Sequence, residues 1–225
     1  MKISVLIPAK GFDNAKQRLS SLLGVAERAA LAEAMLRDVL QQTLAARGVE
    51  AVYVVTGDAE VREIASSLGA RVILEPKEKG ETEAVTFALF DMKWRGAEAA
   101  LVIPADIPLL HANDIEVLIE QAARHDGMSP FVLLVPSHDR MGTNALLLAP
   151  PNVIGLRFGY DSFSYHLNQV SAKGLPLRVV DNERIALDID GPQDLERFLA
   201  AGGGPGESYA KVTEMRAAAR RTGEL

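Results

Sequence analysis

The sequence predicts an α/β fold with a mixed, mainly parallel sheet and a small antiparallel extension. Short apolar runs rich in β-branched residues are bounded by Gly, Pro, Asp or Glu, which is typical of buried strands. In the first half of the chain these runs alternate with longer helical segments, and this alternation indicates parallel strands joined by right-handed crossovers. In the second half, turn-rich segments separate the strands and favour an antiparallel extension.

The first half supplies four strand–helix units. The expected strands are 3–8, 51–56, 71–74 and 100–104. The expected helices are 24–47, 58–68, 81–95 and 113–125, and the third opens with acidic residues that suit the positive end of a helix dipole. Ligands of such sheets bind beyond the carboxyl ends of the strands. We therefore look for the site in the loops that follow these strands.

The second half supplies shorter elements and a tail. Strands are expected at 131–136, 145–149 and 177–180, and helices at 162–173 and 193–200. After a glycine-rich stretch the chain becomes polar and basic, which predicts a frayed helix outside the core. We therefore expect one domain over residues 1–201 and a flexible or helical tail over residues 202–225.

Composition excludes several classes of protein. The chain has 225 residues with 48% hydrophobic content, enough for one sizeable core, and no Cys for disulfides or thiolate metal sites. The first apolar run ends at Pro8, too early for an export signal, so a cytoplasmic location is expected. No apolar run is long enough to span a membrane, and a net charge of −6 disfavours nucleic-acid binding.

A basic loop follows the first strand. Lys10, Lys16 and Arg18 lie beyond the carboxyl end of that strand, where a triphosphate could meet backbone N–H groups and cationic side chains. The spacing allows the three cations to converge on one anion if the segment loops back. A solvated basic turn before a surface helix is the alternative interpretation.

Two acidic turns follow later strands. Asp106 lies between two prolines after an apolar run, where a carboxylate can hold a divalent cation against a triphosphate. Asp188 and Asp190 lie at another junction from a strand into a helix and would point the same way in an extended segment. Alternatively, Asp106 only caps its turn, and Asp190 is the N-cap of the helix that follows it.

Small polar residues between these turns form a third candidate group. Thr143 and Asn144 follow a glycine, and Gly159 and Ser162 lie around the start of a helix, which favours a cradle for a small anion. His166 could contact a phosphate or a carboxylate. A single His four residues into a helix is more often a surface residue, however.

Taken together, these segments resemble the 2-phospholactate guanylyltransferase family, which acts in the biosynthesis of the deazaflavin coenzyme F-420. The resemblance covers about residues 1–200, and the order and spacing of its pieces are specific. The pieces are Ile7-Pro8-Ala9-Lys10, Ala15-Lys16-Gln17-Arg18-Leu19, Pro104-Ala105-Asp106-Ile107-Pro108, Gly142-Thr143-Asn144-Ala145-Leu146, Phe158-Gly159 with Ser162, and Asp188-Ile189-Asp190 with Pro192 and Asp194.

The resemblance implies a fold, a reaction and partners. The fold is a Rossmann-like three-layer sandwich of the nucleotide-diphospho-sugar transferase type. The reaction joins GMP from GTP to 2-phospholactate, phosphoenolpyruvate or 3-phosphoglycerate and releases pyrophosphate, with Mg²⁺ as cofactor. The expected partners are GTP and the acid, with a homodimer as a possible assembly. The alternatives are a cytidylyl- or molybdopterin-directed nucleotidyltransferase of the same fold, or an inactive nucleotide-binding regulator.

The resemblance also assigns roles to residues. The metal ligands it implies are Asp106, Asp188 and Asp190. The catalytic residues are Lys10, Lys16, Arg18 and Asp106, and the acid-binding residues are Thr143, Asn144, Gly159 and Ser162. The nucleotide-binding residues are Pro8, Ala9, Lys10, Thr56, Gly80, Glu81, Glu83, Pro104 and Ala105.

One segment departs from the family pattern. Members usually carry a Gly-Leu-Asn-like stretch where this chain has residues 79–85. Glu81 or Glu83 could accept hydrogen bonds from the N–H donors of guanine. Alternatively, both carboxylates only occupy the first turn of a helix. The base specificity therefore stays open at this point.

Overall fold

The computed structural model describes residues 1–222 apart from 76, 78, 126–129 and 205. The strands are β1 (Ile3–Pro8), β2 (Val49–Thr56), β3 (Arg71–Leu74), β4 (Ala99–Val102), β5 (Phe131–Pro136), β6 (Thr143–Ala149) and β7 (Leu177–Val179). The helices are a 3-10 turn η1 (Gln17–Leu19), α1 (Val25–Ala45), α2 (Ala59–Leu68), α3 (Glu81–Trp94), α4 (Ala112–Ala123), α5 (Ser162–Ala172), α6 (Pro192–Ala200) and α7 (Glu207–Thr222). In this described part, no helix has both the length and the apolar content that a membrane span requires.

The strands form one mixed sheet in the order β3-β2-β1-β4-β6-β5-β7. The first four strands are parallel, and β6 runs antiparallel to both β4 and β5. The mainly parallel sheet with an antiparallel part is thus confirmed. The expectation that 177–180 joins the antiparallel part is wrong, because α5 returns the chain and β7 pairs with β5 in parallel.

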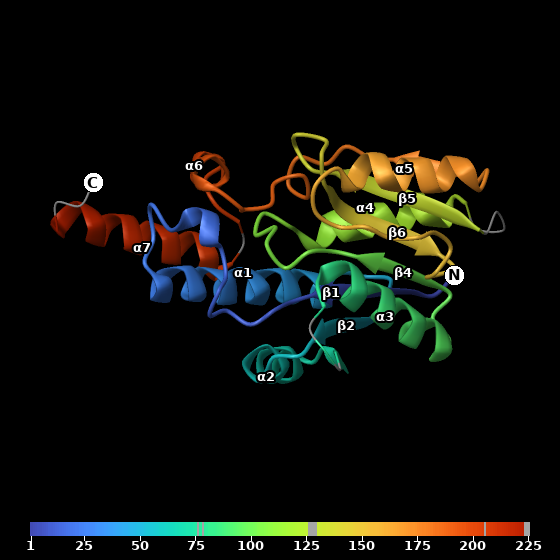
Figure 1. Ribbon diagram of the computed structural model, residues 1–225, viewed down its shortest axis with the longest axis horizontal. Helices are drawn as coiled ribbons and strands as arrows, with labels where there is room; N and C mark the ends of the chain where they lie inside the picture. Colours follow the sequence, from blue (N-terminus) through green and yellow to red (C-terminus); the bar gives the residue numbers. More distant parts are fainter. Residues whose placement is uncertain (76, 78, 126–129, 205, 223–225) are drawn as a thin grey trace.

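Helices cover both faces of the sheet, which gives the three layers of Figure 1. One face packs against α1, α2 and α4, and the opposite face packs against α3 and α5. Because both faces are covered, every residue of β4, β5 and β6 is buried, which explains why these strands are apolar apart from Thr143 and Asn144 at the start of β6. The predicted Rossmann-like sandwich is therefore confirmed.

Side chains and backbone geometry fix the ends of the helices near the site. Asp58 caps α2 by accepting from the N–H groups of Glu60 and Val61. At α6, Asp194 accepts from the N–H of Gly191 at 2.8 Å and from the N–H of Asp190 at 3.2 Å. The N-cap of α6 is Gly191, so the alternative that Asp190 caps this helix is wrong. The Asp190 carboxylate is available for other contacts.

The C-terminal helix α7 lies along α1 (Figure 1). Buried Asp38 of α1 accepts hydrogen bonds from the N–H groups of Glu207 and Ser208 and from the Ser208 hydroxyl. Val212 and Met215 are also buried. The expectation of a frayed helix outside the core is therefore wrong, because this helix is amphipathic enough to cover α1. A domain boundary at residue 201 stays a prediction.

A third apolar cluster joins the loops beyond the sheet, separately from the two clusters on its faces. It contains Leu19 after the basic loop, Leu109 after the first acidic turn, and Leu187 and Ile189 around the second. Residues of α1, α6 and α7 complete it. We call this group the third cluster. Since it ties the three loops together, the polar residues beside them are held close in space.

The segment between α6 and α7 is tightly packed. A β-carbon at Gly204 would overlap the carbonyl oxygen of Pro108, and one at Gly206 would overlap the carboxylate of Asp38. Glycine is therefore required there by close approach of the chain rather than by a need for a loose linker.

Candidate active site

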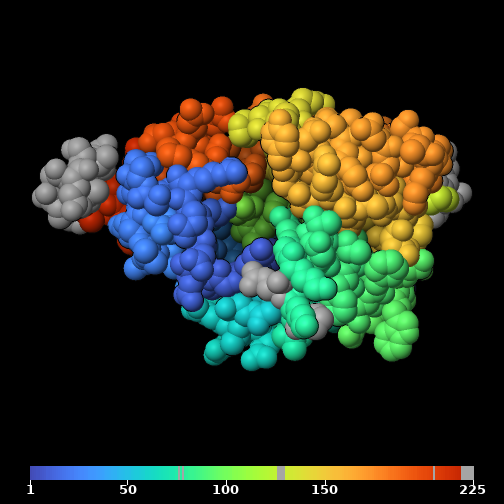
Figure 2. Space-filling view, in the orientation of Figure 1, coloured from blue at the N-terminus to red at the C-terminus, as the bar shows by residue number. Residues whose placement is uncertain are grey.

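A cavity of about 790 Å³ opens beyond the carboxyl ends of β1, β2 and β4. Figure 2 shows the molecule hollowed between the N-terminal segment, the α3 segment and the C-terminal half. Backbone and side chains of the loops after these strands line it, together with the start of α3. The predicted residues among its lining are Pro8, Ala9, Lys10, Lys16, Glu81, Pro104, Ala105 and Asp106.

Lys16 connects the two acidic turns. Its ammonium nitrogen lies 2.5 Å from Oδ2 of Asp106 and 3.1 Å from Oδ1 of Asp190. The backbone of Lys16 adopts a left-handed conformation with φ of 51°, which turns the basic loop back toward the sheet. Burial alone would lower the pKa of Lys16, but the two carboxylates together raise it above its usual value. Lys16 is therefore a desolvated, permanently charged group.

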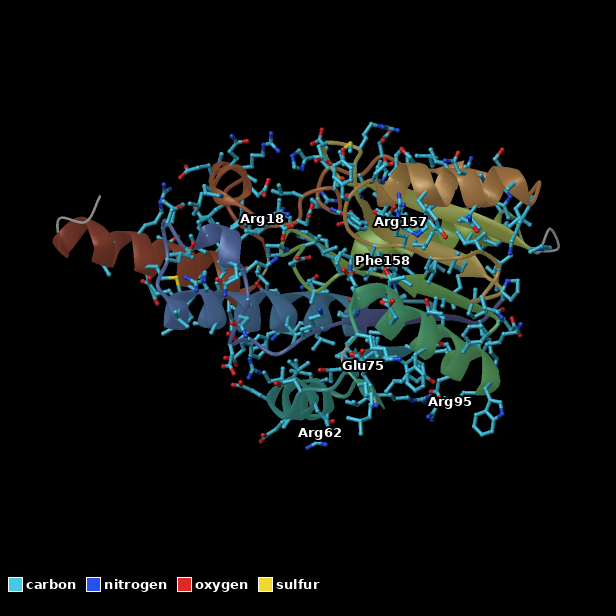
Figure 3. The ribbon with its side chains drawn as sticks, viewed as in Figure 1. Arg18, Arg62, Glu75, Arg95, Arg157 and Phe158 are labelled. Atoms are coloured by element: carbon cyan, nitrogen blue, oxygen red, sulfur yellow. The ribbon has the colours of Figure 1, made fainter. Side chains whose placement is uncertain are left out.

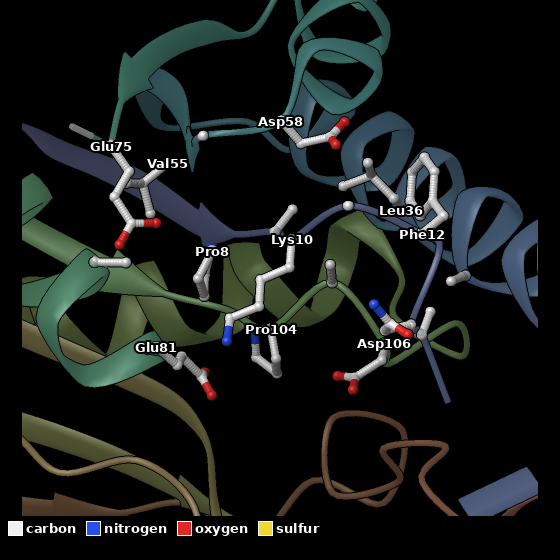
Figure 4. Close-up of a pocket in the computed structure, with 18 of the residues that line it drawn as sticks. Pro8, Lys10, Phe12, Leu36, Val55, Asp58, Glu75, Glu81, Pro104 and Asp106 are labelled. Atoms are coloured by element: carbon white, nitrogen blue, oxygen red, sulfur yellow. The ribbon is translucent and has the colours of Figure 1, made fainter. Parts of the chain in front are cut away.

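The other two cations of the loop lie at different depths. Lys10 lines the cavity, and in Figure 4 its side chain extends toward the same part of the cavity as Glu81. Arg18 lies at the outside, where its guanidinium is 78% exposed and 3.5 Å from Oδ2 of Asp190. The loop thus turns back toward the acidic turns, with Arg18 at the rim. That its three cations converge on one anion stays a prediction.

The two acidic turns are side by side because their backbones are hydrogen-bonded. The N–H of Ile189 donates to the carbonyl oxygen of Asp106 at 3.0 Å. Asp188 is half-buried, and burial followed by the charges of Asp106 and Asp190 raises its pKa. The segment 187–190 is extended without being a strand, so the predicted strand-to-helix junction is wrong in that detail. The three carboxylates nevertheless face a common region.

The donor set fits a hard divalent cation shared with a ligand. No group of three His, Cys, Asp or Glu side chains among the described residues is arranged to hold a metal ion by itself. Mg²⁺ usually takes only one or two carboxylates and completes its shell with water and phosphate oxygens. Asp106 and Asp190 offer two such carboxylates, and the Lys16 ammonium between them demonstrates that the intervening space suits a positive charge.

Glu81 is the acidic residue of the cavity wall at the start of α3. Burial and, second, the charge of Asp106 raise its pKa to about 7, against the opposing effect of Lys10. Glu83 in the same turn is exposed and does not line the cavity. Gly80 and Thr56 also lie outside the lining, and the buried Thr56 hydroxyl accepts from the N–H of Asp58 at 3.0 Å.

The polar residues of the second half form a separate group, which we call the polar cradle: buried Thr143, Asn144 and Ser162, with exposed Gly159. Asn144 donates to Oδ1 of Asp188 at 2.9 Å and to the carbonyl oxygen of Ile185 at 3.0 Å. The N–H of Ser162 donates to the carbonyl oxygen of Gly159 at 3.2 Å. The bond from Asn144 joins the polar cradle to the acidic turns.

His166 supports the polar cradle from inside the protein. Its ring has no exposed surface, and its Nδ1 lies 3.0 Å from Oγ1 of Thr143. Burial and then the charge of Arg157 lower its pKa to about 4. The expectation of a surface histidine is wrong because His166 lies one helical turn after buried Ser162, on the same inward face of α5. That spacing was the signal in the sequence.

Two further polar contacts of the site were not predicted. Thr82 in the first turn of α3 accepts at Oγ1 from the N–H of Phe158 at 2.9 Å. The preceding N–H, of Arg157, points at Nε2 of His166 at 3.3 Å. These main-chain contacts depend on tertiary packing, and no residue type in the sequence marks them.

A family model described as guanylyl transferase CofC like matches residues 3–223 of the chain. The chain belongs to this family. The resemblance expected from the motifs is therefore confirmed, and with it the assignment to the nucleotidyltransferases of this fold rather than to unrelated α/β proteins.

Curated relatives of the family carry three related names. A phosphoenolpyruvate guanylyltransferase of Rubrobacter xylanophilus is 37% identical, covering 90% of this chain and 96% of its own. A 2-phospho-L-lactate guanylyltransferase of Methanothermobacter thermautotrophicus is 35% identical, covering 91% and 87%. A 3-phospho-D-glycerate guanylyltransferase of Phenylobacterium zucineum is 35% identical, covering 84% and 86%.

Solved structures share the fold at lower identity. A nucleotide-diphospho-sugar transferase structure from Desulfovibrio desulfuricans, so described only provisionally, aligns with a TM-score of 0.77 at 19% identity and covers 98% of each chain. A Mycobacterium tuberculosis glucosyl-3-phosphoglycerate synthase, solved with Mn²⁺ and UDP, aligns with a TM-score of 0.58 at 13% identity, covering 95% of this chain and 79% of that one. These structures support the CofC-like chain's fold assignment.

Proposed function

We propose that this protein transfers GMP from GTP to a small phosphorylated three-carbon acid and releases pyrophosphate, as a step in coenzyme F-420 biosynthesis. The observation that carries the proposal is the buried Lys16 ammonium between Asp106 and Asp190, at a cavity large enough for a nucleotide. The names of the relatives support guanylyl transfer over the cytidylyl and molybdopterin alternatives.

The residues of the charged cavity support this chemistry. The phosphate of the acceptor is already an anion, so its attack on the α-phosphate needs alignment and relief of charge repulsion rather than a general base. Lys10 and Lys16 can neutralise the triphosphate and the departing pyrophosphate, with Arg18 at the rim. Asp106 and Asp190 would hold Mg²⁺, with Asp188 behind them, and the metal would offset phosphate charge.

Nucleotide and acceptor would occupy different parts of the site. Pro8, Ala9, Pro104 and Ala105 line the cavity and would contact the nucleotide, while Glu81 could accept from guanine N–H groups. Thr56, Gly80 and Glu83, which lie outside the lining, would act only by shaping the wall. Thr143, Asn144, Gly159 and Ser162 would hold the acid.

Pyrophosphate release tests the proposal directly. Purified protein is incubated with GTP, Mg²⁺ and one of the three acids named by the relatives, with reactions lacking the acid as controls. We expect GTP-dependent release with at least one acid, and loss of release when EDTA removes the metal. The absence of pyrophosphate release with all three acids would reject guanylyl transfer to this class of acceptor. A preference for CTP would support the cytidylyl alternative instead.

A mass spectrum of the product from a mixture of the three acids identifies the acceptor. The acids compete for one site in that mixture, so the dominant product reports the ratio of their kcat/KM values. This measurement also separates the three names that the relatives carry.

A further inference from the structure

A buried hydrogen-bonded pair, Thr143 and His166, connects the polar cradle to α5. Thr143 begins β6, and its hydroxyl oxygen is 3.0 Å from Nδ1 of His166 on α5. The imidazole packs edge-on against the rings of Phe158 and Tyr165, with centroid distances of 5.5 Å and 5.8 Å. These two rings and the lack of exposed surface hold the imidazole in one orientation.

The second ring nitrogen determines where the imidazole proton lies. The backbone N–H of Arg157 points at Nε2 from 3.3 Å, and a backbone N–H can only donate. Nε2 must therefore accept, so it carries no proton. A neutral imidazole has one N–H, which then lies on Nδ1 and donates to the Thr143 hydroxyl oxygen.

The hydroxyl of Thr143 is thereby oriented. When its oxygen accepts from Nδ1–H, its own hydrogen cannot point back at the histidine and is free to donate away from it. We propose that His166 is a positioning residue that presents the Thr143 hydroxyl as a hydrogen-bond donor to an anionic oxygen of the acceptor acid. This inference rests on the proposed function, and it makes the polar cradle selective for a group with an unprotonated oxygen at that point.

The same histidine also orders the loop that carries Gly159. Two successive N–H groups of this loop are held by opposite walls: Arg157 by His166 and Phe158 by the Thr82 hydroxyl. Figure 3 shows Phe158 between α5 and the start of α3. Gly159 follows with φ of 90°, a left-handed conformation that this anchored loop requires. The loop therefore reaches the acceptor region in a fixed shape.

Replacement of His166 separates positioning from simple filling of space. His166→Phe keeps the ring volume but removes both polar contacts. We expect it to raise the KM for the acid about tenfold or more, the cost of one misdirected hydrogen bond to a charged group. The KM for GTP should stay within about twofold. His166→Asn, whose amide can donate near the position of Nδ1, should recover most of the affinity for the acid.

A double-mutant cycle tests whether the effect passes through Thr143. Thr143→Val should raise the KM for the acid as His166→Phe does, and the double variant should be no worse than the poorer single variant. Thr143→Ser keeps the hydroxyl and should therefore raise the KM for the acid less than Thr143→Val does. Val170→Ala, one helical turn after His166 and also buried, is the matched packing control. It should lower thermal stability while leaving the KM for the acid unchanged.

The tautomer is measured without any substrate. A long-range ¹H–¹⁵N correlation spectrum of the histidine side chains, with His166 assigned from the His166→Asn variant, should show the Nδ1–H form. An Nε2–H form would overturn the inference. Given an active wild type, the inference would also be overturned if the His166→Phe variant kept the wild-type KM for the acid. Equal losses of affinity for the acid and for GTP in that variant would overturn it as well. If the wild-type protein showed no transferase activity with any of the acids, the proposed function and this inference would both be rejected.

Discussion

The charged cavity and the polar cradle present opposite kinds of chemistry. The cavity presents charged groups, Lys16 and Asp106 among them, in a space open to solvent. The polar cradle presents neutral groups, Thr143 and Asn144, which are buried and are held by hydrogen bonds with His166 and Asp188. On the proposed function, one side would attract its ligand by charge, and the other would recognise its ligand by the direction of individual hydrogen bonds.

This difference indicates a division of labour. Charge–charge attraction acts over several ångströms and tolerates adjustment, which suits a flexible triphosphate with a metal ion. A buried hydrogen-bonding group left without its partner is costly, so a neutral pocket discriminates between ligands that differ by a few atoms. Substitutions on the two sides should therefore fail in different ways.

The largest effect is expected from Asp106→Asn in the charged cavity. This change removes the charge that faces Lys16 and the proposed metal, and we expect kcat to fall about a hundredfold to a thousandfold. Some stability should also be lost, because Lys16 then keeps only Asp190 as a charged partner, and a thermal melt checks that the variant is folded. Asp181→Asn, in an exposed pair with Arg140, is the matched control and should stay fully active. Near-normal turnover by Asp106→Asn would contradict the metal role.

The next largest effect is on stability, at the junction of the two sides. Asn144→Ala leaves the carbonyl oxygen of Ile185 and the carboxylate of Asp188 without their donor. We expect the free energy of unfolding, measured with urea, to fall by about 1 to 3 kcal/mol. Asn152→Ala removes an exposed partner of Lys93 and should cost almost nothing. Equal losses in both variants would argue against a buried network.

A smaller, pH-dependent effect is expected from Glu81. Its folded pKa of about 7 lies above the ordinary value of 4.5, so the folded state binds the proton more tightly than the unfolded state. The resulting stability is present below pH 4.5 and is lost as the pH rises through 7. Glu81→Gln should abolish this loss in metal-free urea titrations between pH 5 and pH 8. The loss is worth roughly 1 to 2 kcal/mol once solvent screening of the partly exposed carboxyl group is included. Glu83→Gln, exposed in the same turn, should leave the wild-type pH dependence in place.

The smallest effect is expected at the rim of the cavity. Arg18 is mostly exposed and contacts Asp190 only at 3.5 Å, so Arg18→Ala should lower kcat/KM less than about fivefold, and less still in high salt. Lys16→Met, in the buried position, should lower it far more. If Arg18→Ala lowered kcat/KM as much as Lys16→Met does, the depth of a cation in the cavity would not determine how much it contributes to catalysis.

The sequence predicted most of the local structure and the meeting of distant loops. Apolar runs such as Phe131–Pro136 carry their own signal, because a strand covered on both faces is apolar throughout. The convergence of the basic loop with Asp106 follows from parallel strands, whose carboxyl ends share one edge of the sheet. These inferences need no knowledge of side-chain packing.

Roles that depend on a single tertiary partner escaped prediction. By residue type, buried His166 and buried Asp38 look like surface residues, because hydrogen bonds from distant parts of the chain, such as those with Thr143 and Ser208, make their burial tolerable. The parallel direction of β7 was not predicted for a similar reason, since it depends on the position at which the chain leaves α5. Asp190 was assigned two alternatives, and the position of Asp194 excludes the N-cap alternative only once the structure is known.

The third cluster has a consequence for how the protein is made. It packs Leu19 against Val212, which leaves the ribosome much later than Leu19 does. The basic loop therefore lacks part of its support until α7 has been synthesised. A nascent chain holds the cations of this loop without the framework that aligns them, and this framework closes only after α7 has emerged.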